Sequence, residues 1–218
     1  MNLKTLAIFA LVPIALSALT ACIPLIATGA AVGAAVAVDR RTLGAQLDDR
    51  AIQVKANLRL KEVLPGDELA FANVYAHNRQ LLITGLAPDA RSKARAEQIA
   101  AGVDNIRAIH NELQVGAPDP LVSSTKDTIT GARVRAALIQ EPMVESTAVR
   151  IVTEARTVYL MGIVTKVEGQ RIAKAASAIR GVDKVVTVFD YVTEEELATL
   201  QREQTKQIEG NKAPASNN

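Results

Sequence analysis

The stretch 102–115, which reads GVDNIRAIHNELQV, decides the fold because it recurs in altered form at 181–192 as GVDKVVTVFDYV. Both copies begin with Gly-Val-Asp and continue as an apolar-rich run that is typical of a β-strand. The upstream segments also align, and the matched pairs are Val54 with Val134, Leu58 with Leu138 and Gly85 with Gly162. Two copies are too few for a solenoid, so the repeat predicts two tandem domains.

The same order of elements is predicted around both copies from hydrophobic periodicity and turn residues. This order is helix, strand, strand, helix, strand, which gives an α+β fold of two α-β-β-α-β units. In each unit, two helices can cover one face of a three-stranded mixed sheet and bury one core. The predicted ranges are helix 48–64, strands 72–76 and 81–83, helix 89–101 and strand 106–115 in the first unit, and helix 127–139, strands 149–153 and 158–160, helix 166–179 and strand 185–192 in the second.

Glycines are predicted to mark the ends of several elements. Gly85 and Gly162 end the second strand of each unit, where a chain turns sharply or packs closely. Gly102 and Gly181 are predicted to stop the second helices as C′ residues. Thr165 opens a Thr-Lys-Val-Glu segment with the spacing of a capping box, which predicts the start of the second helix in the second unit.

The N-terminus is typical of a lipoprotein signal peptide. Lys4 precedes an apolar stretch, and Cys22, the only cysteine, follows a small residue in the tetrad LTAC at 19–22. The tetrad resembles a bacterial lipobox, in which the cysteine thiol is alkylated with diacylglycerol before the signal is cut. We therefore expect a covalent diacylglycerol and an N-acyl chain on Cys22, and no other cofactor.

A membrane span is the alternative interpretation of the same region. Residues 5–38 contain no charged side chain and are long enough to cross a bilayer. A span gives no reason for a cysteine at the cleavage position, however, and Pro13 and Pro24 weaken one continuous helix. Ile23, rather than Asp, after the cysteine favours the outer membrane of a Gram-negative cell. Residues 23–38 would then either lie on the bilayer or act as a spacer.

Composition excludes some classes of protein. The charges nearly cancel, with 25 Lys and Arg against 23 Asp and Glu, whereas a nucleic-acid-binding protein would carry a basic stripe. Aromatic residues make up 3% of the chain and Trp is absent, so Ala, Val, Ile and Leu must build the core. A single cysteine cannot form a disulfide within the chain.

Composition also suggests the boundaries of the parts. The segment GAPDP at 116–120 begins a linker, because Gly and Pro disfavour regular structure. The tail has an acidic start and a polar end, so we expect at most a short helix within a disordered segment. The predicted parts are signal peptide 1–21, lipidated small-residue leader 22–45, first domain 46–116, linker 117–125, second domain 126–193 and tail 194–218.

These residues resemble a known bacterial family, the BON domain. Its pattern has a glycine after the second strand and a later Gly-Val before the last strand, which Gly85, Gly162, Gly102 and Gly181 fit. The whole chain is similar to outer-membrane lipoproteins with two BON domains. This similarity rests on the lipobox, the small-residue stretch at 28–49, DTITGARVRAAL at 127–138 and VYLMGIVT at 158–165.

The resemblance implies a non-enzymatic protein tethered to the periplasmic face of the outer membrane, where it maintains envelope integrity. It also implies that the first helix of the second domain, 127–139, contacts anionic phospholipid. The residues that correspond to this contact are Ile129, Thr130, Arg133, Val134 and Arg135. The family pattern places an aromatic membrane anchor at position 129, where this chain has an aliphatic side chain.

The residues give no sign of an enzyme. His77 and His110 fall at non-equivalent places of the first repeat, and Glu154 and Phe189 match them in the second. Nothing near either histidine completes a set of nucleophile, base and orienting group. We therefore expect no catalytic residue and no metal ligand, since His/Cys ligand spacing and phosphate loops are also absent from the sequence.

Two functions remain open from the sequence. The first is a tethered module whose second domain contacts anionic phospholipid. The alternative is a periplasmic adaptor that binds a protein, such as an envelope assembly factor, a secretin or a cell-wall-linked partner. Nucleic acid is expected to be a partner in neither case.

Overall fold

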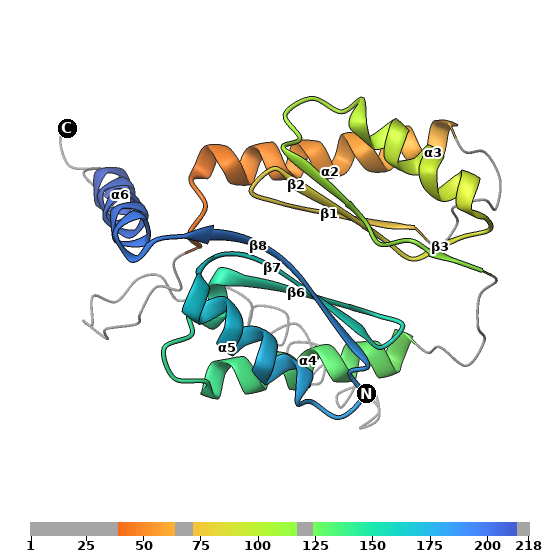
Figure 1. Cartoon of the computed structure of the whole chain (residues 1–218). Coiled ribbons are helices and arrows are strands. Elements are labelled where there is room, and N and C mark those ends of the chain that lie inside the picture. The colour runs from red at the N-terminus through yellow and green to blue at the C-terminus, as the bar shows by residue number, and fades with distance from the viewer. Residues whose placement is uncertain (1–38, 64–71, 117–123, 213–218) are drawn as a thin grey trace, which may run out of the picture. The chain divides into compact units, whose positions relative to one another are not determined.

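The computed structural model describes residues 39–63, 72–116 and 124–212 (Figure 1). All of them belong to one compact unit, Ala37–Asn218, which contains all the hydrophobic cores given below. A unit with its own cores can fold without the preceding segment. The predicted signal peptide, Cys22 and most of the predicted leader and linker lie outside the described residues. Among the described helices, none has the length and apolar character needed to cross a membrane.

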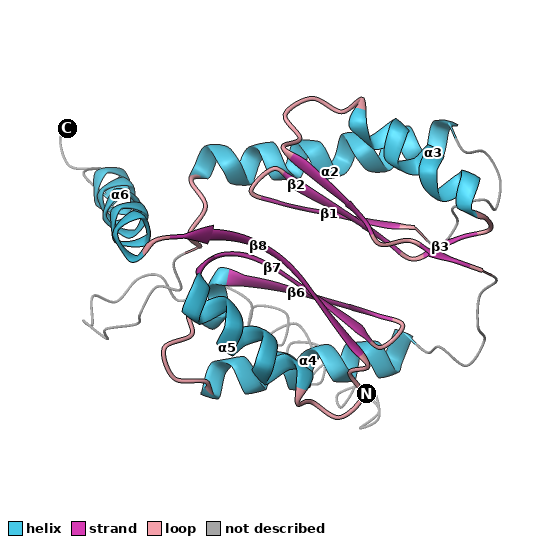
Figure 2. Ribbon diagram, viewed as in Figure 1, coloured by secondary structure: helices cyan, strands magenta, loops and turns pink. Residues whose placement is uncertain are grey.

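The main elements of both repeats have the predicted α-β-β-α-β order, which confirms the α+β fold class, and the first repeat adds two short strands that pair with each other in a separate sheet. In each repeat both helices cover the same face of a mixed sheet (Figure 2). The first repeat contains α2 (Leu43–Val63), β1 (Asn73–His77), β2 (Gln80–Thr84), β3 (Leu86–Ala87), α3 (Ala90–Ala101), β4 (Ala108–Asn111) and β5 (Gln114–Val115). The second contains α4 (Ser124–Gln140), a 3-10 turn (Ser146–Ala148), β6 (Val149–Glu154), β7 (Thr157–Thr165), α5 (Lys166–Ser177) and β8 (Lys184–Val192), and α6 (Glu194–Lys212) follows.

The central strand of each sheet pairs antiparallel with the strand before it and parallel with the last strand. In the first repeat the order is β1-β2-β4, and in the second it is β6-β7-β8. β2 and β7 are buried along their whole length. Strands covered on both faces need continuous apolar runs, and this explains the sequences QLLIT and TVYLMGIVT.

Alternate side chains of the central strands enter different cores. Leu81 and Ile83 pack with α2 and α3, whereas Leu82 belongs to a cluster with Tyr159 and Met161 of β7. That third cluster joins the two sheets on the faces opposite to their helices. Each large apolar side chain buried in these cores contributes about 1.5–3 kcal/mol, so the repeats stabilise each other.

Each repeat uses a helix aspartate to hold its hairpin turn. Both turns, Asn78-Arg79 and Ala155-Arg156, have two residues with positive φ, as in a type I′ hairpin. The carboxylate of Asp49 accepts from the amides of the first turn at 2.7 and 2.6 Å. Asp127 accepts from the second at 2.9 and 3.1 Å. The carboxylates of Asp49 in α2 and Asp127 in α4 are therefore structural.

These aspartates correct the predicted alignment of the first helices. The buried residues of α2 are Asp49, Ile52, Ala56 and Leu60, and those of α4 are Asp127, Thr130, Val134 and Leu138. Val134 therefore corresponds to Ala56 and Leu138 to Leu60. The predicted partners Val54 and Leu58 are instead 55% and 53% exposed. The match VKANL/VRAAL was wrong by half a helical turn, because it followed residue type and not the buried face.

The glycines were only partly predicted. Gly85 follows β2 with φ of 108°, as expected. Gly162 instead lies inside β7, where a Cβ atom would come within 2.7 Å of the Ala148 carbonyl oxygen, so close packing requires it. Gly181 does not stop α5, which ends at Ser177, but it has φ of 104° in the loop that follows. The capping box at Thr165 and Glu168 is confirmed.

The tail is also corrected, because α6 runs from Glu194 to Lys212. Thr193 and Glu196 exchange hydrogen bonds at its start, and Leu197 is 7% exposed. Such a cap and an apolar contact stabilise a helix that the polar sequence alone does not indicate. Gln204 of α6 donates to the Asp39 carbonyl oxygen at 2.5 Å, so the helix also holds the end of the leader.

Candidate lipid-contact surface

The predicted contact residues divide between the two faces of α4. Ile129 is 48% exposed, and the side chains of Arg133 and Arg135 are also exposed. Thr130 and Val134 are only 6% and 0% exposed. These two positions are corrected, because their side chains face the core and cannot touch a bilayer while the helix stays folded.

The reason is the helical period. Thr130 and Val134 lie three and seven residues after Asp127, on the face that packs against the sheet. Thr130 lies so near the loop after α5 that a Cβ atom on Gly181 would come within 3.0 Å of its Oγ1. The five predicted residues fall in two runs of neighbouring positions and therefore mix both faces, whereas one face of a helix repeats every three or four residues.

The outer face of α4 includes residues that the sequence interpretation missed. Ala132, Ala136 and Ile139 follow Ile129 at helical spacing and are exposed, and Ile139 is 66% exposed. We call these four residues the α4 stripe. The same 3-4-3 spacing was present in the sequence, but it could not be assigned to the outside before the buried face was known.

The charges beside the α4 stripe are more positive than a simple count suggests. Asp127 is 8% exposed and both its oxygens are bound in the turn, and Glu141 lies 3.7 Å from Arg171. Lys126, Arg133 and Arg135 are exposed, and within the described side chains they form no ion pair. Such an apolar stripe with free basic residues beside it is suited to an anionic interface.

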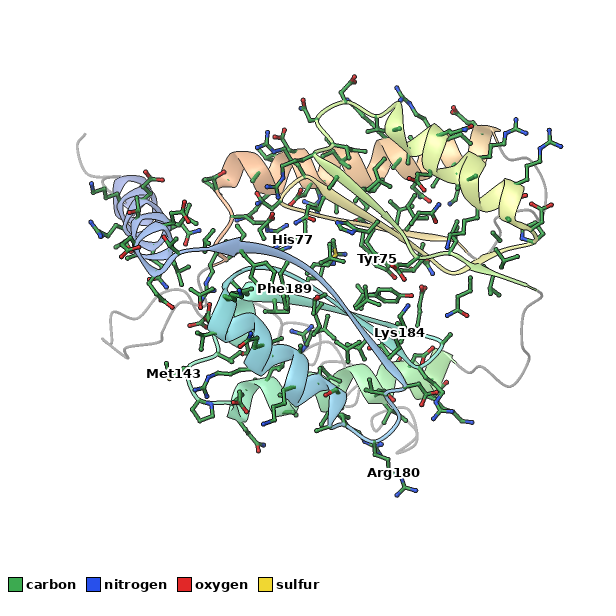
Figure 3. All side chains as sticks on the ribbon, viewed as in Figure 1. Tyr75, His77, Met143, Arg180, Lys184 and Phe189 are labelled. Carbon is green, nitrogen blue, oxygen red and sulfur yellow. The ribbon has the colours of Figure 1, made fainter. Side chains whose placement is uncertain are left out.

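A cavity of about 630 Å³, here called the α4 groove, lies between α4 and β6. Its helix wall is made of the small residues Gly131, Ala132 and Ala136, together with Arg135. Glu154 and Tyr75 line it from the strands, and Figure 3 shows Tyr75 on β1. Burial raises the pKa of Glu154, and the nearby charge of Asp127 raises it further, although hydrogen bonds from Thr84 and Asn73 oppose this shift.

Both histidines lie in the three-stranded sheet of the first repeat. His77, labelled in Figure 3, is 6% exposed, and burial is the main cause that lowers its pKa to about 4, so the ring is neutral. The ring of His110 shares a hydrogen bond with Gln80 at 2.8 Å. The register pairs His110 with Leu82 and Val186 with Tyr159, so Val186, and not Phe189, is its counterpart. Within the described residues, no group of three or more His, Cys, Asp or Glu could hold a metal.

The two repeats match a known family model. The model of the BON domain matches residues 48–117 and 126–193. The chain belongs to the BON-domain family. Each match spans one of the two α-β-β-α-β repeats, so the aspartate-held hairpins and outer helices described above are features of this chain's two BON domains.

Two relatives align with most of this chain. The outer membrane lipoprotein DolP of Haemophilus influenzae is 30% identical over 174 residues, which cover 80% of this chain and 90% of that protein. The 21 kDa hemolysin of Actinobacillus pleuropneumoniae is 30% identical over 155 residues, which cover 71% of this chain and 80% of that protein. The first similarity supports the expected association with the outer membrane.

Solved structures add no argument about this chain. CdsD, a structural protein of the type III secretion system of Chlamydia trachomatis, aligns with 9% identity and a TM-score of 0.27. The alignment covers 66% of this chain and 96% of that structure. The fold assignment therefore rests on the two BON domains and on the sheets themselves.

Proposed function

We propose that this chain is a non-enzymatic lipoprotein of the outer membrane, tethered through acylated Cys22, and that the α4 stripe contacts anionic phospholipid on the periplasmic face. Its role is to maintain envelope integrity. The observation that carries the proposal is the outer face of α4, where exposed apolar residues lie beside basic side chains that form no ion pair with any described side chain.

In this proposal the acyl chains on Cys22 hold the protein on the membrane, and the α4 stripe orients it there. Two or more acyl chains hold a protein stably on a membrane, so the α4 stripe need not supply the affinity. A tethered domain meets the bilayer at high effective concentration, and weak contacts then decide its orientation. Each basic residue near an anionic surface contributes about 1 kcal/mol.

The test uses residues 37–218 without the tether and measures flotation with neutral and anionic vesicles. Arg133→Glu should weaken binding to anionic vesicles roughly 30-fold, because reversal of one charge changes the energy by about 2 kcal/mol. Lys55→Glu, at the equivalent position of α2, is the matched control and should have a smaller effect. Equal binding to both kinds of vesicle would contradict the proposal.

The tether needs a separate measurement. Cells that express the full chain should incorporate labelled fatty acid into it, and Cys22→Ala should abolish this label and release the protein from the membrane fraction. Label that persists in Cys22→Ala would contradict attachment at this cysteine.

The alternative, a protein-binding adaptor, is favoured by a different surface. Leu43, Leu47, Val54 and Leu58 lie on one side of α2 and are each 53–70% exposed. We call them the α2 stripe. Exposed apolar residues that form a continuous patch often mark protein interfaces. If the adaptor function is correct, crosslinking in cells through α2 should trap one dominant protein, and lipid composition should not change the yield.

A further inference from the structure

The α2 stripe lies on the side of α2 that is opposite to the core of the first domain. Leu47, Val54 and Leu58 are 70%, 55% and 53% exposed, and the small residue Ala51 between them is exposed as well. The buried residues of the same helix begin at Asp49 and follow the other side. The described part of the chain therefore leaves this stripe in contact with solvent.

The spacing of the stripe is that of a helix that packs against another helix. Leu47, Ala51, Val54 and Leu58 follow one another at intervals of four, three and four residues, as the a and d positions of a coiled coil do. Side chains at these intervals enter the gaps between the side chains of a facing helix. The second domain does not repeat this pattern, because its equivalent positions are Thr125, Ile129, Ala132 and Ala136.

The stripe is complementary to itself when two copies of α2 pack antiparallel. A two-fold axis that passes between positions 52 and 53 places Leu47 opposite Leu58 of the second copy and Ala51 opposite Val54 of the second copy. Small residues then face branched ones at the centre, and leucines face leucines at both ends. A two-fold contact forms each of these pairs twice, so one patch supplies both sides of the interface.

The charges beside the stripe favour the same arrangement. Antiparallel packing brings Asp48 near Lys55 of the second copy, and symmetry repeats this pair of opposite charges. Parallel packing would instead bring Arg50 near Lys55 of the second copy, which is repulsive. Asp48 forms no ion pair within the described side chains, and the contact of Lys55 with Asp104, at 3.8 Å, lies in solvent and is easily exchanged.

The small size of the stripe sets the expected strength of the contact. A standard protein interface contains about 20–30 residues a side, far more than one helix face provides. We therefore expect the free protein to associate weakly. Chains that are tethered to one membrane meet at a much higher effective concentration, and a weak contact is then populated.

We propose that the α2 stripe binds the α2 stripe of a second copy of this chain, in an antiparallel two-fold contact. The inference goes beyond the lipid contact of α4 and does not depend on it. The adaptor alternative assigns the same stripe to a different protein. The mass of the product trapped through α2 distinguishes the two.

The first experiment is analytical ultracentrifugation of residues 37–218 at concentrations up to about 1 mM, the effective concentration that a short tether gives. A monomer–dimer equilibrium is expected. Leu58→Glu should raise its dissociation constant at least about tenfold, because a charge would enter an apolar contact. Ile139→Glu, which changes an exposed apolar residue of α4, is the matched control and should leave the constant unchanged. A monomer at every concentration, or a dimer lost only in Ile139→Glu, would overturn the inference.

A charge exchange tests the antiparallel register. Asp48→Lys and Lys55→Asp should each weaken the dimer, because each variant places like charges opposite one another across the two-fold axis. The double variant restores opposite charges at both places and should recover the dissociation constant of the unmodified protein. A double variant that is weaker than either single variant would overturn this register.

The last experiment traps the contact in cells that express the full chain. Ala51→Cys lies close to the two-fold axis, so a short bifunctional thiol reagent should link two copies and give a product of twice the chain's mass. Gln98→Cys, at an exposed position of α3, is the control and should give little of this product. A product that contains a different protein, or equal yields at the two positions, would overturn the inference.

Discussion

The first helices of the two BON domains share an inner face and differ on the outer one. In both, an aspartate holds the hairpin turn and three further residues enter the core. On the outside, α2 carries Val54 and Leu58 where α4 carries Ala132 and Ala136. In the part of the chain that the structure describes, Arg133 and Arg135 of α4 form no ion pair, whereas Lys55 of α2 lies 3.8 Å from Asp104.

The two domains therefore share the helix residues that face the core and differ in the helix residues that face outward. The inner positions are fixed by packing, because each change there opens a cavity or leaves a polar group unpaired. Outer positions have little effect on stability, so they can diverge toward separate tasks. In the proposed function the outer face of α4 contacts the bilayer, which leaves α2 available for other contacts.

The largest expected effect is a pH dependence of stability that has opposite signs at His77 and Glu154. These are the last residues of β1 and β6, directly before the two hairpin turns. The folded-state pKa of His77 is about 4 against 6.5 when unfolded, so its neutral form stabilises the fold above pH 6.5 and this stability is lost as the pH falls toward 4. The expected loss in the free energy of unfolding is about 3 kcal/mol. Urea denaturation of the wild type and of His77→Leu near pH 4 and above pH 6.5 should show this loss in the wild type only. If the two proteins differed in unfolding free energy by the same amount at both pH values, the prediction would be contradicted.

Glu154 should behave in the opposite way. Its pKa is raised in the folded state, mainly by burial, so the charged carboxylate lowers stability as the pH rises through and above its unfolded value of 4.5. Glu154→Gln should therefore lessen the fall in the free energy of unfolding as the pH rises above 4.5. In the same denaturation series, the two variants should change the pH profile with opposite sign.

The next effect tests the shared frame. Asp127→Ala leaves two turn amides without an acceptor and should lower the free energy of unfolding by about 2–3 kcal/mol. Asp49→Ala should cost at least as much, because Arg41, which lies 2.8 Å from Asp49, also loses a partner. Thermal denaturation measures both. A large loss in one domain and none in the other would show that the two turns are not held in the same way.

The smallest effect tests the variable surface. Ala136→Leu and Leu58→Ala exchange exposed residues between the domains, and each should change stability by less than about 0.5 kcal/mol. Denaturation midpoints check this expectation. A loss as large as that of a core substitution would mean that the outer faces are part of the packing.

The sequence predicted elements whose signals are local. The hairpin turns and the capping box at Thr165 depend on neighbouring residues, and the α-β-β-α-β order follows from their succession. The alignment of α2 with α4 was wrong because Val54 and Leu58 are as apolar as core residues, and only the sheet shows which side is covered. Gly162 is required because the Ala148 carbonyl oxygen lies close to it, and Ala148 belongs to the 3-10 turn before β6, which the local sequence around Gly162 does not show.

The candidate site was predicted only in part for the same reason. Ile129, Arg133 and Arg135, which come from the family pattern, are exposed and stay predicted contacts, whereas Thr130 and Val134 are buried. The α4 groove depends on Glu154 and Tyr75, which come from strands distant in sequence. Its chemistry could not be assembled before the two sheets were placed together.

The central claim is that the outer face of α4, and not that of α2, meets the bilayer. Residues 37–218 contain no cysteine, so Ile129→Cys and the equivalent Ala51→Cys each give one labelling site for a polarity-sensitive fluorophore. On anionic vesicles, we predict a blue shift for the label at position 129 and none at position 51. A shift at position 51 without one at position 129 would contradict the account.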